Sequence, residues 1–127
     1  MTGMHYVHWT EVPARMWPCK FFKPNEIACK GTGAILIHAE ALTALDQLRQ
    51  NCDTPLHISS AYRSPYHNSV VGGAPLSAHL VGHAFDVRLR GMDKTELREE
   101  AERVGFTGFG MRYRTFMHVD MGRRREW

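Results

Sequence analysis

The sequence predicts an α+β domain in which a small, mainly antiparallel sheet is flanked by helices. Segments with alternating apolar and polar residues lie among segments with helical spacing, and the two kinds do not follow one another in regular βαβ order. At 127 residues, with 43% hydrophobic and 23% charged residues, the chain has the size and composition of an ordinary globular protein. The longest purely apolar run covers only residues 34–37. We therefore expect one domain over residues 1–127, with no membrane segment.

The first half of the chain contains one clear helix and one clear strand. Residues 1–36 are expected to be rich in loops, because prolines separate short segments there. A helix follows from His38 to Gln50, with apolar residues at helical spacing. Residues 56–62 alternate as a strand does. Ser64-Pro65 then begins a turn or a short helix that ends at Gly72-Gly73.

The second half is expected to contain three strands and a helix. Residues 83–89 alternate as a strand that places His83 and Asp86 on opposite faces. A capping-box pattern with Asp93 as the N-cap opens a helix that stops at Gly105. Two final strands, residues 106–111 and 116–121, are joined by a polar turn.

The cysteines and the net charge exclude few classes of function. Cys19, Cys29 and Cys52 contain no CxxC pair and are interpreted as reduced, partly buried thiols; a Cys19–Cys29 bridge or a thiolate metal site has no further support. The net charge is +3, with arginines gathered in residues 112–114 and 123–125. Such arginines either form a solvated edge or attract a polyanion, which would be nucleic acid or an acidic cell-wall polymer. Because the chain lacks recognised nucleic-acid-binding signatures, we expect no nucleic acid as a partner.

Histidines and aspartates interrupt two otherwise apolar segments, residues 77–86 and 118–120. Such groups are costly in apolar surroundings unless a partner or a metal ion satisfies them. If strand 116–121 pairs with strand 83–89, His79, Asp86 and His118 can converge as three ligands with a fourth position open, as in catalytic zinc sites. The alternative is that these residues form ordinary hydrogen-bonded or surface pairs. Strand alternation removes His83 from the set.

Two motifs resemble those of the zinc D-alanyl-D-alanine carboxypeptidase family. Residues 77–86 match its SxHxxGxAxD signature, and His118-Val119-Asp120 is similar to the second signature, whose histidine is the third zinc ligand. The resemblance extends to residues 60–68 and 72–75, and residues 22–29 and Trp127 are similar to a small, core-only subgroup. It implies the fold shared by Hedgehog signalling domains and D,D-peptidases, and one Zn²⁺ held by His79, Asp86 and His118.

The resemblance also suggests roles beyond the metal ligands. Many relatives carry an acidic catalytic residue three positions before the last zinc histidine, where this chain has Thr115. Asp120 is the remaining candidate, and we expect it to be the catalytic residue that orients or deprotonates the attacking water. The alternative is that it is a carboxylate that orients His118. Arg63 is expected to bind a substrate carboxylate, and Ser77 to hydrogen-bond a substrate or its own loop.

The expected function is zinc-dependent hydrolysis of amide bonds in peptidoglycan stem peptides or cross-links that involve D-amino acids. The alternatives are a non-catalytic, zinc-containing module that binds cell wall, such as a phage virion component, and, more weakly, a metal-dependent nucleic-acid enzyme. The partners expected are peptidoglycan peptides, and the protein is expected to be a monomer. No secretory signal is visible at the N-terminus, so access to the wall would depend on cell lysis or a phage particle.

Overall fold

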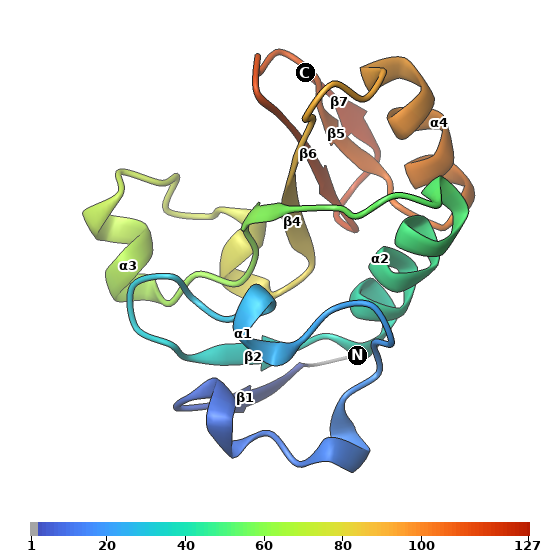
Figure 1. Ribbon diagram of the computed structural model, residues 1–127. Helices are drawn as coiled ribbons and strands as arrows, with labels where there is room; N and C mark the ends of the chain where they lie inside the picture. Colours follow the sequence, from blue (N-terminus) through green and yellow to red (C-terminus); the bar gives the residue numbers. More distant parts are fainter. Residues whose placement is uncertain (1–2) are drawn as a thin grey trace.

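The computed structural model describes residues 3–127, which form two sheets and four α-helices (Figure 1). The α+β prediction is confirmed, and all strand pairs but one are antiparallel. Residues 1 and 2 of the expected N-terminal loop segment lie outside the described residues. Among the helices of residues 3–127, none combines the length and the apolar composition needed to cross a bilayer.

The larger sheet has five strands in the order β3-β4-β6-β5-β7. Its strands are β3 (Ile58–Ser60), β4 (Ala84–Arg88), β6 (Phe116–Asp120), β5 (Gly108–Gly110) and β7 (Arg125–Glu126). The condition for a metal site, pairing of the second predicted strand with the last, is met because β4 and β6 are antiparallel neighbours. Only β5 and β7 run parallel.

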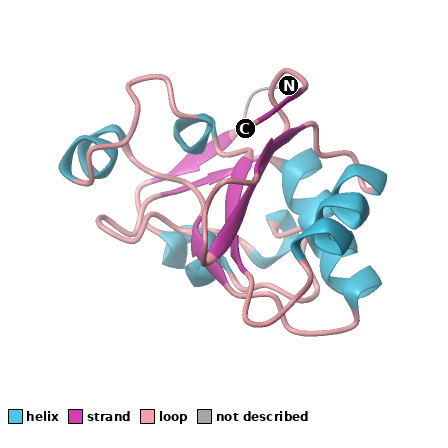
Figure 2. Ribbon diagram, turned by 90° about the horizontal axis from the view of Figure 1, so that it is seen from above, coloured by secondary structure: helices cyan, strands magenta, loops and turns pink. Residues whose placement is uncertain are grey.

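Two long helices cover one face of this sheet, α2 (Ala39–Cys52) and α4 (Lys94–Arg103) (Figures 1 and 2). The apolar stripe of α2 and the alternate residues Phe85, Val87 and Val119 of β4 and β6 are completely or almost completely buried in the core between them. The opposite face of β4 and β6 carries polar residues, and the segment with α3 (Pro65–Val70) lies on that side (Figure 2). Alternation along the strands therefore separates the core from the candidate site.

The predicted helices agree closely with the structure. The side chain of Asp93 accepts a hydrogen bond from Glu96 N at 3.0 Å, which caps α4 as the sequence predicts. Gly105, with φ +116°, follows the end of this helix. Helix α2 extends to Cys52, slightly beyond the prediction, and ends at Asp53 in the left-handed conformation. All three cysteines are free thiols.

The prediction that residues 1–36 are rich in loops with short segments named no strand or helix there. A small two-stranded sheet joins β1 (Met4–Tyr6) to β2 (Ile35–Ile37), and three short helices lie between them. These helices are η1 (Trp9–Glu11), η2 (Ala14–Met16) and α1 (Pro24–Ile27). Strand β7 was also absent from the prediction. The strands β3 and β5 are equally short, but each lies within a longer segment that the sequence marks as a strand, whereas β1, β2 and β7 lack such a flanking pattern.

Candidate metal centre

The register of the sheet places Asp86 directly opposite His118. The two residues are antiparallel partners in β4 and β6, on the face away from the core. Both side chains are buried, and Asp86 Oδ1 lies 3.0 Å from His118 Nδ1. Ala84, also on this face of β4, is fully buried and adds little bulk beside them.

His79 reaches the same point from a 3-10 helix, η3 (Ala78–Val81). The Ser77 hydroxyl accepts a hydrogen bond from His79 N at 3.2 Å and caps this helix. Gly82, with φ +79°, then turns the chain into β4, and a side chain there would also meet Leu36. The Nδ1–H of His79 donates to the Ala61 carbonyl at 2.6 Å, which leaves Nε2 facing Asp86 Oδ1 at 3.3 Å.

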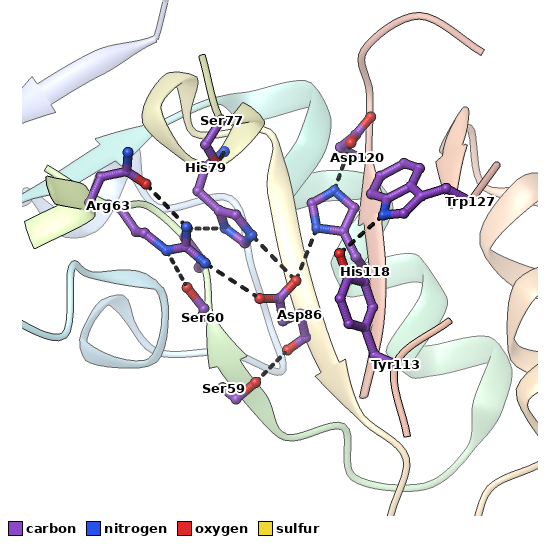
Figure 3. A network of polar contacts seen from close by, with 12 residues as sticks. Ser59, Ser60, Arg63, Ser77, His79, Asp86, Tyr113, His118, Asp120 and Trp127 are labelled. Atoms are coloured by element: carbon purple, nitrogen blue, oxygen red, sulfur yellow. Dashed lines mark hydrogen bonds and ion pairs between the residues drawn. The ribbon is translucent and has the colours of Figure 1, made fainter. Parts of the chain in front are cut away.

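The structure thus brings together the three residues expected to ligate a metal. One nitrogen or oxygen from each of His79, Asp86 and His118 lies within 4.8 Å of the others, and all three residues are buried (Figure 3). We call this set the His-Asp-His trio. Two imidazole nitrogens and one carboxylate oxygen form a donor set that suits zinc, so the residues present fit the expected ion.

The electrostatics of the trio keep a negative charge at its centre. Burial opposes ionisation of Asp86, but hydrogen bonds from His118 and His79 outweigh it and lower the pKa of Asp86 to about 2. Burial also lowers the pKa of His118, but hydrogen bonds with Asp120 and Asp86 outweigh it and raise that pKa overall. The carboxylate of Asp86 is therefore ready to bind a cation.

Asp120 contacts the far side of His118. Its Oδ2 lies 2.7 Å from His118 Nε2, whereas His118 Nδ1 faces Asp86, so the imidazole ring separates the two carboxylates (Figure 3). Asp120 is completely buried and also accepts hydrogen bonds from Gly122 N at 2.9 Å and from Arg125. This is the contact that a carboxylate makes when it orients a ligating histidine.

Arg63 lies beside Asp86, on the side of the trio away from Asp120 (Figure 3). Its Nη2 is 3.7 Å from Asp86 Oδ2, and its Nε and Nη1 donate to Ser60 Oγ and Asn68 Oδ1, each at 3.1 Å. These two hydrogen bonds hold the guanidinium plane in place. In the structure Arg63 thus forms an ion pair with Asp86 inside the site. Ser77, the other residue expected to bind substrate, lines the cavity above the trio together with Arg63.

A cavity of about 400 Å³ opens over the trio. Sequence reasoning missed four residues of its lining: Tyr113, Phe116, Arg125 and Trp127. The available signals were aromatic residues within and beside an otherwise polar turn, for Tyr113 and Phe116, and the resemblance of Trp127 to the core-only subgroup, which named the residue without a role. His83, which strand alternation excluded, packs against the ring of His38 at 5.6 Å and is not part of the trio.

Comparison with known families gives one finding. Residues 20–120 match the family model described as peptidase M15, and this range contains the whole trio, Arg63 and Asp120. A comparison with curated proteins gives no match.

Proposed function

Because the chain belongs to the peptidase M15 family, we propose that it is a zinc peptidase that cleaves amide bonds in peptidoglycan. The substrates would be stem peptides or cross-links that involve D-amino acids. The observation that carries this proposal is the buried His-Asp-His trio at a cavity large enough for a short peptide segment.

The ligand nitrogens are set by hydrogen bonds elsewhere on each ring. Ala61 O fixes the proton of His79 on Nδ1, and Asp120 favours the proton of His118 on Nε2. His79 Nε2, Asp86 Oδ1 and His118 Nδ1 would therefore hold the ion. When bound, zinc would supply a Lewis acid for the scissile carbonyl and for the attacking water.

Arg63 is proposed to bind a carboxylate of the substrate. Arg63 lines the cavity, and the contact of its Nη2 with Asp86 is long for an ion pair, at 3.7 Å. When a cation neutralises Asp86, this guanidinium group becomes available to a second carboxylate. Stem peptides carry such groups at their termini and side chains.

Asp120 is proposed to orient His118 rather than to act as the base. Both of its oxygens are engaged by the protein: Oδ2 faces His118 Nε2 and Arg125 Nη2, and Oδ1 accepts from Gly122 N and Arg125 Nη1. The base role is the alternative, and substitution of Asp120 by asparagine separates the two roles.

A second candidate function is a zinc-containing module that binds cell wall without cleaving it. Thr115 favours this alternative, because it occupies the position of the usual acidic residue and its side chain is exposed. Digestion of purified peptidoglycan distinguishes the two functions, because only the peptidase releases fragments.

The test is digestion of purified peptidoglycan with zinc-loaded protein, followed by mass analysis of the released fragments. We expect fragments that carry a new amine and a new carboxyl group, and none from chelator-treated protein or from His118→Ala. The exposed His57 provides a matched control, because His57→Ala removes an imidazole outside the cavity and should cleave as wild type does. Undiminished cleavage by metal-free protein would overturn the zinc mechanism, and sedimentation with peptidoglycan without any fragment would favour the binding module.

A further inference from the structure

Tyr113 stands at the edge of the cavity with a hydroxyl group that the mechanism above does not use. It lies in the turn between β5 and β6 and lines the same cavity as the trio. Figure 3 shows it on the opposite side of Asp86 from Arg63. A substrate that crosses Asp86 would therefore pass between the two side chains.

The hydrogen bond between Trp127 and Tyr113 determines what the hydroxyl can do. Trp127 Nε1 donates to Tyr113 Oη at 3.0 Å, and an indole N–H cannot accept. The phenolic oxygen is therefore an acceptor in this pair, and its own proton remains free to donate. Within residues 3–127, the hydroxyl makes no other hydrogen bond.

Several contacts hold the Tyr113 ring in one position. It stacks on Phe116 with ring centroids 4.5 Å apart and an interplanar angle of 15°. Lys94 Nζ donates to the carbonyls of Met111 and Tyr113, at 2.7 and 2.6 Å, and so fixes the backbone of the turn. A donor held in this way needs little reorganisation before it acts.

Gly110 links the surroundings of Tyr113 to those of His118. A Cβ at Gly110 would lie 2.8 Å from Tyr113 Cε2, 2.9 Å from His118 Cβ and 3.0 Å from Trp127 Cζ2. The Trp127 ring also lies 5.1 Å from that of His118. Trp127 is therefore a direct neighbour of His118, and Tyr113, Trp127 and His118 all border one position that only glycine leaves free.

We propose that Tyr113 is a catalytic residue whose hydroxyl donates a hydrogen bond to the scissile carbonyl oxygen. This inference rests on the proposed peptidase function. Attack of water on an amide places negative charge on that oxygen, and a fixed neutral donor stabilises the charged state more than the ground state. Tyr113 keeps its proton throughout. Trp127 is the positioning residue, because its indole N–H faces the phenolic oxygen and so directs the hydroxyl proton of Tyr113 away from the indole.

The test compares Tyr113→Phe with wild type on a muropeptide that wild type cleaves. Loss of one such donor should lower kcat by about 100-fold, with KM, zinc content and the thermal unfolding midpoint unchanged. A phosphinate analogue of the cleaved bond carries a tetrahedral anionic group, and its affinity measured by calorimetry should fall by a similar factor. Tyr66→Phe is the matched control, because Tyr66 is 73% exposed on α3 and lies outside the cavity.

Each outcome supports or overturns the inference. A Tyr113→Phe variant with wild-type kcat and wild-type phosphinate affinity overturns it and leaves the proposed function standing. A parallel loss of zinc and of kcat also overturns it, because that pattern assigns Tyr113 a structural role. If the wild-type protein cleaves no peptidoglycan, the proposed function fails, and this inference fails with it.

Discussion

Replacement of Asp120 by asparagine separates the two roles that this residue can have. Both carboxylate oxygens accept from N–H groups: Oδ2 faces His118 Nε2 at 2.7 Å and Arg125 Nη2 at 3.2 Å, and Oδ1 faces Gly122 N at 2.9 Å. An asparagine has the same shape but only one oxygen. In either orientation, its NH₂ group must therefore face an N–H donor.

Each orientation of the amide has a different cost. If the NH₂ group faces His118, the imidazole proton moves to Nδ1, which is the nitrogen that faces Asp86 at 3.0 Å. If it faces Gly122 instead, a partly buried backbone N–H loses its acceptor. A lost hydrogen bond to a charged group is worth about 1.5–3 kcal/mol, or roughly 10- to 150-fold in an equilibrium constant.

We therefore expect Asp120→Asn to weaken zinc binding by about 10- to 100-fold, the range typical of residues that orient a ligating histidine. The assay is a zinc titration against a competing chelator, followed by cleavage measured at saturating zinc. Cleavage should recover at saturating zinc, since the ion then holds His118 in place. Asp93→Asn is the control, because asparagine caps a helix as well as aspartate does.

The opposite pattern would refute this reasoning. If Asp120→Asn binds zinc with wild-type affinity and still cleaves nothing at saturating zinc, Asp120 acts on the water and is the base.

The remaining predictions concern packing and the thiols. Gly110→Ala should lower the free energy of unfolding by about 1–3 kcal/mol, because the new methyl group lies 2.8 Å from Tyr113 and must displace it; an unchanged urea midpoint would contradict this. Leu45→Ala, at a completely buried position of α2, should cost about 2–5 kcal/mol in the same assay, whereas Thr43→Ala on the exposed face should stay within about 0.5 kcal/mol. Burial and the charge of Asp46 raise the pKa of the Cys19 thiol to about 12, so Cys19 should react with a thiol reagent at pH 8 only after unfolding, as mass analysis of labelled peptides would show.

Local patterns predicted the long elements and the faces of the central strands. The α4 helix follows its capping residue, and α2 follows its apolar stripe. The strands that carry Asp86 and His118 were found because alternation over five residues is a local property. The short strands β1, β2 and β7 were missed, because the residues around them carry no extended alternation and only pairing with another strand defines them.

The motifs likewise indicated which residues would meet but not how they would meet. His79, Asp86 and His118 could be named from spacing and resemblance once the pairing of their strands was assumed. Which nitrogen of each histidine faces Asp86 depends on Ala61 and Asp120. The sequence offered contact between Asp120 and His118 as one of two alternatives, whereas the contact between His79 and Ala61 does not follow from the pattern.

The sequence alone therefore determined the α+β class, the three residues that meet as the His-Asp-His trio, and the absence of an acidic residue at position 115. The tertiary structure decided that Asp120 lies behind His118 and that Tyr113 and Trp127 border the cavity. The physical reason is that strand alternation and helix capping act between near neighbours in the chain. The tautomer of a histidine and the free proton of a tyrosine depend instead on hydrogen-bond partners that only folding brings within about 3 Å.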